Sequence, residues 1–302
     1  MKTFYMILTL AIATIVLLVA VLFAIPAIKM HTMLDRRCSC EPYSAADYGI
    51  SSRPVALTSA DGIELGAYEV AVESPKAVII CIGGIHSPTI TDWYPHASLF
   101  AQHGYASLLL DLRAHGASSG EVIYAATREW MDVAAAVDYL NTQATYDDVP
   151  KVVMGLSMGA ATAITSIGRC ADIDALVALS SYSSWEYNFN LNVEQQLPAW
   201  LAKVLTPFVN ITTRLRFGEY ADVTPLSEIK KLGSRPALLV HSTGDRIVPF
   251  ANFEQLIAAA PAVQRWVVEG DNHCILEDFT HPEHNSDYCS VILNFLDSVA
   301  RR

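Results

Sequence analysis

A serine between two glycines lies at the junction of an apolar run and a stretch of small residues. The segment 155–159, GLSMG, follows the apolar run 151–154 and precedes the small residues of 160–163. A sharp turn from a strand into a helix needs glycines on both sides, because larger side chains would clash, and it exposes the serine hydroxyl at the end of the sheet. The N-terminus of the following helix would face a developing oxyanion. The sequence therefore predicts a nucleophilic serine at Ser157.

A base and an acid follow in the order that such a serine needs. A serine hydroxyl becomes nucleophilic when a histidine takes its proton and a carboxylate orients that histidine. Asp245 comes after the apolar run 237–240, and His273 comes after the run 264–268. Loops that follow parallel strands meet at one edge of the sheet. We therefore expect Ser157, His273 and Asp245 to act as nucleophile, base and orienting acid.

The rest of the chain contains the elements that would hold these residues. Short apolar runs typical of strands buried on both faces lie at 77–82, 106–110, 151–154, 175–179, 237–240 and 264–268. Segments with helical spacing lie between and after them, at 93–103, 127–140, 160–168, 253–259 and 290–299. Two alternating runs, 53–58 and 63–72, flank an Asp-Gly pair and predict a hairpin. The fold class is α/β, with a mostly parallel central sheet and helices on both faces.

One region interrupts the alternation of strands and helices. No strand pattern occurs in residues 183–231, which are rich in aromatic and aliphatic side chains. Long loops without secondary structure are uncommon in compact domains. We expect a small helical cap over the sheet.

The order Ser, Asp, His, with each residue just past a strand, resembles the α/β-hydrolase arrangement. Four further stretches match that superfamily, at 60–65, 111–118, 224–229 and 244–249. Within it, residues 53–302 resemble capped serine hydrolases: serine aminopeptidase-like, monoacylglycerol-lipase-like and membrane-anchored Bem46-like proteins. The resemblance implies an α/β-hydrolase fold and acyl-enzyme chemistry without a cofactor or metal.

The same resemblance implies an oxyanion hole of two main-chain N–H groups. One belongs to the residue after the nucleophile, Met158, and the other to the loop after the first parallel strand. We expect Gly84 to supply the second, with Ile85 as the alternative if the register shifts by one. The family commonly has a His-Gly pair where this chain has Ile82 followed by glycine, which is a departure in this loop.

Other polar residues offer alternatives. Asp111 and His115 could form a second acid and base, although the resemblance implies that they brace a loop, and Asp271 could replace Asp245. A metal site is conceivable at His281, Glu283 and His284, or at Cys38 and Cys40, although a solvated loop is the simpler interpretation of the histidines. Disulfides between cysteines 38, 40, 274 and 289 are conceivable if the domain is exported.

The N-terminal segment has a different character. Residues 4–28 contain no charged side chain, and these 25 residues are enough to cross a bilayer. We predict a transmembrane anchor over 1–30, a polar irregular linker over 31–52 and the hydrolase domain over 53–302; a cleaved signal sequence and a helix packed against the domain are the alternatives. Positive charge is nearly balanced on the two flanks. A short N-terminal tail is easily retained in the cytosol, so we expect the domain on the extracytoplasmic side.

Composition excludes some functions and leaves others open. The 302 residues carry a net charge of −11, which argues against nucleic acid as a partner, and their 52% hydrophobic content argues against a disordered chain. The prediction is a membrane-anchored serine hydrolase that cleaves a carboxylic ester with an apolar acyl group, from a small-molecule or lipid substrate. The alternatives are an aminopeptidase-like peptidase, an acyltransferase, and a non-catalytic scaffold with the same fold.

Overall fold

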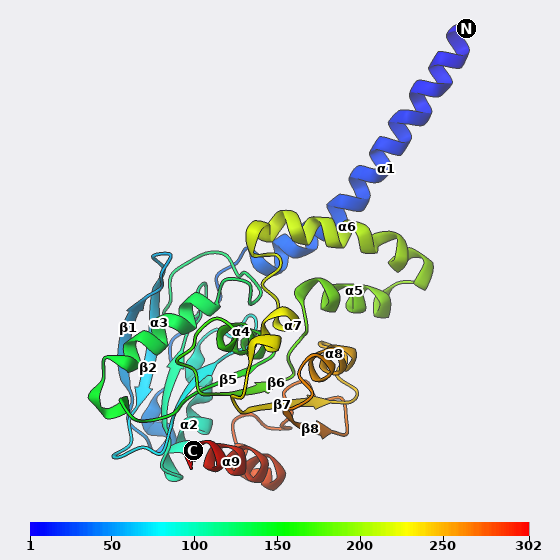
Figure 1. The fold of residues 1–302 in the computed structure, drawn as a ribbon. Helices are drawn as coiled ribbons and strands as arrows, with labels where there is room; N and C mark the ends of the chain where they lie inside the picture. The colour runs from blue at the N-terminus through cyan, green and yellow to red at the C-terminus, as the bar shows by residue number, and fades with distance from the viewer. Residues whose placement is uncertain (302) are drawn as a thin grey trace.

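A single eight-stranded sheet organises the computed structural model, which describes residues 1–301 (Figure 1). Its strand order is β1-β2-β4-β3-β5-β6-β7-β8. The strands are β1 (Arg53–Thr58), β2 (Glu64–Val70), β3 (Val78–Ile82), β4 (Ala106–Leu110), β5 (Lys151–Leu156), β6 (Ala175–Leu179), β7 (Ala237–Ser242) and β8 (Gln264–Val268). Strand β2 pairs antiparallel with β1 and with β4, and all other pairs are parallel. The predicted hairpin and mostly parallel sheet are confirmed.

Helices cover both faces of the sheet, as predicted. Helices α2 (Tyr94–Gln102) and α9 (Ser286–Ala300) cover one face, and α3 (Trp130–Asn141), α4 (Met158–Ile167) and α8 (Ala251–Ala259) cover the other. Short 3-10 helices are η1 (Ala45–Tyr48), η2 (Ile90–Trp93), η3 (Ala144–Tyr146), η4 (Gly218–Tyr220), η5 (Ile229–Lys231) and η6 (Pro282–His284). Along β3, Ile80 and Ile82 face one core while Ile79 and Cys81 face the other. This alternation explains why the central strands are apolar throughout.

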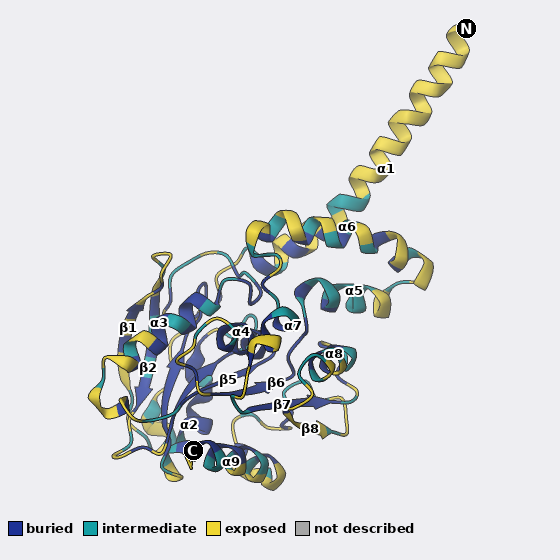
Figure 2. Cartoon of the chain, in the orientation of Figure 1, coloured by how far each residue is buried: buried dark blue, intermediate teal, exposed yellow. Residues whose placement is uncertain are grey.

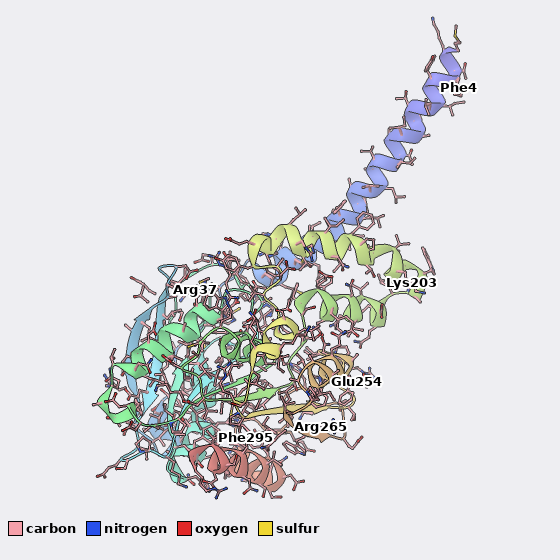
Figure 3. The ribbon with its side chains drawn as sticks, viewed as in Figure 1. Phe4, Arg37, Lys203, Glu254, Arg265 and Phe295 are labelled. Carbon is pink, nitrogen blue, oxygen red and sulfur yellow. The ribbon has the colours of Figure 1, made fainter. Side chains whose placement is uncertain are left out.

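Strand β8 departs from the prediction of a strand buried on both faces. Gln264, Arg265 and Val267 are exposed, and Arg265 lies on the outside of the molecule (Figure 3). The strand pairs only with β7, at the end of the strand order. An edge strand has one uncovered side, so its side chains need not all be apolar.

The cap consists of two helices above the carboxyl ends of the strands (Figure 1). These are α5 (Trp185–Gln196) and α6 (Ala199–Phe217), and no strand lies between β6 and β7, as predicted. Helix α7 (Pro225–Glu228) falls within the predicted cap but packs against α4. The contact is close at Gly168, which ends α4, because a Cβ atom there would lie only 2.7 Å from Glu228. Of the predicted cap 183–231, α5 and α6 lie over the strand ends and α7 lies against α4.

Helix α1 (Lys2–Leu34) extends away from the domain and then bends to pass beside α6 (Figure 1). Residues 2–21 are exposed, and Phe4 lies near the free end (Figures 2 and 3). Met30 and Leu34, by contrast, are fully buried in the domain core. Helix α1 thus continues four residues past the predicted anchor boundary at residue 30, and tertiary packing stabilises its last turn.

The segment after α1 is also more ordered than the predicted irregular linker. Cys38 N–H donates to the Ala114 carbonyl at 2.8 Å, and Gly116 N–H donates back to the Cys38 carbonyl at 2.8 Å. Arg37 donates to the carbonyls of Ser118 and Gly116 from the same stretch. Within residues 1–301 every cysteine is an unpaired thiol. The chain is thus fastened to the domain by main-chain hydrogen bonds before β1 begins.

Candidate active site

Ser157 occupies the turn between β5 and α4 with a strained backbone, at φ 57° and ψ −117°. A Cβ atom on Gly155 would lie 2.3 Å from the Gly159 carbonyl group, and one on Gly159 would lie 2.4 Å from the carbonyl oxygens of Ile82 and Gly83. Real Cβ contacts are never this short, so both positions require glycine. The tight packing of the helix against the sheet produces the turn that presents Ser157.

His273 and Asp245 are paired at the carboxyl edge of the sheet. His273 Nδ1 donates to Asp245 Oδ2 at 2.7 Å. The other oxygen, Asp245 Oδ1, accepts from the N–H groups of Ile247 at 2.8 Å and Val248 at 2.9 Å. The Asp245 side chain is fully buried. These bonds fix the carboxylate and leave Nε2 as the ring nitrogen available for proton transfer.

The end of strand β6 brings the Ser157 and His273 segments together. Ser157 N–H donates to the Leu179 carbonyl at 2.8 Å, and the hydroxyl of the next residue, Ser180, donates to the His273 carbonyl at 2.7 Å. Within residues 1–301 no hydrogen bond joins the Ser157 hydroxyl to the His273 ring. Such bonds are often long without substrate and shorten in the substrate complex.

Both residues expected to form an oxyanion hole lie next to Ser157. Met158 is the first residue of α4, so its N–H has no acceptor within the helix. A Cβ atom on Gly84 would lie 3.6 Å from the Ser157 Cβ, so the loop after β3 lies against Ser157. Ile82, where the family commonly has histidine, is buried as the last residue of β3.

A cavity of about 860 Å³ opens at Ser157 beneath the cap. Ser157 and Met158 lie at this cavity, and its other walls come from five parts of the chain: α1 (Ile25, Pro26, Ile28, Lys29, Thr32 and Met33); the loop after β3 (Ile85 and His86); Tyr182 and the segment of α5 (Trp185, Asn188, Phe189, Asn192, Val193, Gln196 and Leu197); α6 (Leu205 and Val209); and the loop after β7 (Ile247 and Val248). The contribution of α1 is absent from the sequence prediction. Met33, which lines the cavity, and the buried Leu34 continue the apolar pattern past the predicted boundary at residue 30, and this continuation is a signal that could have indicated the contribution of α1.

Asp111 makes main-chain contacts that suit a bracing role. Its Oδ1 accepts from Ile90 N–H at 2.7 Å and its Oδ2 from Ala117 N–H at 2.9 Å. His115 bonds the Arg113 carbonyl rather than Asp111, and burial lowers the His115 pKa to about 4. Asp111 thus connects the segment after the β3 loop to the segment after β4.

Asp271, His281, Glu283 and His284 lie on the surface, whereas Cys38 is buried. Asp271 is exposed, and Asp245 holds the hydrogen bond to His273 in its place. His281 pairs with Asp278 at 2.8 Å and stacks on His284 with 5.0 Å between ring centroids. Within residues 1–301 no group of three or more His, Cys, Asp or Glu side chains has metal-binding geometry.

The buried carboxyl group of Asp92 should make the free energy of unfolding depend on pH. Burial raises its pKa from 3.8 to about 6, with help from the negative charge of Asp111, although the Ser87 hydroxyl donates to it at 2.9 Å. The folded chain binds this proton more tightly than the unfolded chain does, so the carboxyl group lowers stability as pH rises from about 4 through 6. We expect Asp92→Asn, which stays neutral, to raise the free energy of unfolding by about 1–3 kcal/mol at pH 7.5 and by little at pH 4.5.

Denaturant unfolding of the full chain at both pH values checks this prediction. The matched control is Asp147→Asn, which removes an exposed carboxylate. An equal gain from Asp92→Asn at both pH values would show that the buried charge is not the cause.

The sheet order, the strained serine turn and the His-Asp pair at the carboxyl edge together define an α/β hydrolase. Residues 73–231, just over half of the chain, match the family model described as serine aminopeptidase, S33. The chain belongs to this family.

Curated relatives match most of the chain, and solved structures share its fold. An uncharacterized protein of Bacillus subtilis, YqkD, is 28% identical over 250 residues, which cover 80% of this chain and 78% of the relative. The esterase Pf2001 of Pyrococcus furiosus has a TM-score of 0.67 at 20% identity, covering 87% of this chain and 98% of that one. A bacterial membrane phospholipase A has a TM-score of 0.61 at 17% identity and covers 100% of both chains. At these identities the solved structures establish the fold.

Proposed function

We propose that the chain is a membrane-anchored serine hydrolase that cleaves carboxylic esters with an apolar acyl group. The observation that carries the proposal is the strained Ser157 at the mouth of an apolar cavity, on the same sheet edge as the hydrogen-bonded Asp245 and His273.

The reaction follows from these positions. Ser157 Oγ attacks the ester carbonyl while His273 Nε2 takes its proton, and the oxyanion is held by the N–H groups of Met158 and Gly84. The C–O bond to the alcohol then breaks, and His273 returns the proton to the leaving oxygen. Water next attacks the acyl-enzyme with His273 again as base, which releases the carboxylic acid and restores Ser157. Asp245 keeps the proton of the resting imidazole on Nδ1 and stabilises the imidazolium.

The cavity lining supports an apolar acyl group over a peptide. Among the described residues, no Asp or Glu lines the cavity. An aminopeptidase must bind a charged amino terminus, and a buried charge is costly without a partner. The esterase and the phospholipase among the solved structures agree with an ester substrate.

Helix α1 and the cap support a position at the membrane surface. One helix of the described chain, α1, is long and apolar enough to span a bilayer. The neighbouring α6 exposes Trp200, Val204, Ile211 and Leu215 to solvent. Exposed apolar side chains beside a membrane helix are typical of a surface that rests on lipid.

A series of esters with increasing acyl length tests the substrate class on the full chain in detergent. We expect medium or long acyl esters to be turned over best, with aminoacyl amides far slower. Val193 lines the cavity, so Val193→Trp should shorten it and lower kcat/KM for the longest ester by about 10-fold or more, while short esters change little.

The matched control is Val204→Trp, which places the same side chain on the exposed face of α6. Best turnover on aminoacyl amides would overturn the ester proposal. Equal effects of both tryptophans would show that the cavity does not bind the acyl chain.

A further inference from the structure

The C-terminal end of α1 is capped by the hydrolase domain. The last carbonyl groups of a helix have no partners within the helix. In α1 the Met33 carbonyl accepts from His86 Nε2 at 2.7 Å, and the Leu34 carbonyl accepts from Ile123 N–H at 2.8 Å. The membrane-proximal helix is therefore bound directly to a loop of the active site.

His86 belongs to the loop that passes the nucleophile. It lies two residues after Gly84, and Ser87 N–H donates to the Gly84 carbonyl at 3.2 Å to close the turn. His86 has a φ of 65°, a conformation that costs free energy for any residue with a Cβ atom. A tertiary contact must hold such a residue in place, and the bond to Met33 is the one that the imidazole makes.

The other side of α1 is held by the cap. Arg216 of α6 donates to both oxygens of Asp35, the residue that follows α1, with one distance of 3.1 Å. The Phe23 and Phe208 rings meet edge to face with centroids 4.8 Å apart. The end of α1 is thus fixed between the cap and the His86 loop, and it lines the same cavity.

We propose that His86 is a positioning residue through which α1 holds the oxyanion loop, so that turnover depends on the docked end of the membrane helix. The inference rests on the proposed ester hydrolysis and adds to it a dependence on the anchor. The Nε2–H of His86 fixes the turn that carries the Gly84 and Ile85 N–H groups. Without this hydrogen bond, the two N–H groups no longer point at the carbonyl oxygen of the substrate. The loss destabilises the transition state more than it weakens substrate binding.

The test compares His86→Ala, His86→Gln and wild type as full chains in detergent, on the best ester. Loss of one oxyanion donor costs about 100–1,000-fold in kcat, and a displaced donor should cost less. We expect His86→Ala to lower kcat by about 10–100-fold with KM within about 2-fold. Glutamine keeps an N–H donor at nearly the same reach, so His86→Gln should restore most of kcat.

The matched control is His103→Ala, which removes a similar bond of 2.8 Å to the Leu99 carbonyl at the end of α2. It should leave kcat unchanged. An active wild type with His86→Ala kcat within 2-fold, or with glutamine no better than alanine, would overturn this inference alone. A folded wild type that cleaves no ester and binds no fluorophosphonate would instead overturn the proposed function, and the inference with it.

Discussion

Ser157→Ala is expected to abolish covalent labelling by a fluorophosphonate probe and to lower kcat for ester hydrolysis by about 10,000-fold or more. The alanine has no oxygen to attack the carbonyl, so the acyl-enzyme route is lost while the cavity stays intact. The fold should tolerate the change, because within residues 1–301 the Ser157 hydroxyl makes no hydrogen bond and alanine, like serine, has a Cβ atom at this strained φ of 57°. The free energy of unfolding should therefore change by less than about 1 kcal/mol.

Gel fluorescence of the labelled full chain measures this result, beside a thermal unfolding curve. Ser298→Ala is the matched control, since Ser298 lies on α9, where its hydroxyl bonds only the Phe295 carbonyl of the same helix. Undiminished labelling of Ser157→Ala would identify another nucleophile. A folded wild type without labelling would favour the non-catalytic scaffold.

The succession of strands and helices along the chain, and the edge at which Ser157, Asp245 and His273 gather, were predictable from local signals. Each residue follows an apolar run of strand length, and parallel strands have their carboxyl ends at one edge. The glycines around Ser157 were also recognisable from the sequence, because a tight strand-to-helix turn leaves no room for a Cβ atom. In the structure such an atom would clash with the adjacent turn at Gly155 and with the end of β3 at Gly159.

The features that sequence reasoning missed depend on contacts between distant segments. The exposure of β8 follows from its place at the end of the strand order, which pairing across the whole sheet decides. The docking of α1 depends on Met30 and Leu34, whose apolar character continues that of the span. The hydrogen bond between His86 and the Met33 carbonyl joins residues 53 positions apart, and no periodicity in the sequence predicts such a contact.

Asp245→Asn is expected to lower kcat by about 1,000–10,000-fold at neutral pH while KM and stability change little. The reason lies in the two N–H groups, from Ile247 and Val248, that donate to Asp245 Oδ1. In the variant these donors require the amide oxygen at that position, so the amide NH₂ must take the place of Oδ2 and point at His273 Nδ1. The neutral imidazole then has to accept at Nδ1 and carries its proton on Nε2, so it cannot take the proton of Ser157.

Steady-state kinetics on the ester series and fluorophosphonate labelling rates measure this effect. Asp271→Asn is the matched control, since Asp271 lies two residues before His273 but is exposed and does not hold its ring. It should keep kcat within about 2-fold, as surface substitutions away from a site generally have small effects. If Asp271→Asn lost activity and Asp245→Asn kept it, the acid would have to be reassigned to Asp271. A large loss from Asp245→Asn alone would mean that two main-chain N–H groups, by fixing one carboxylate oxygen, set the tautomer on which the serine depends.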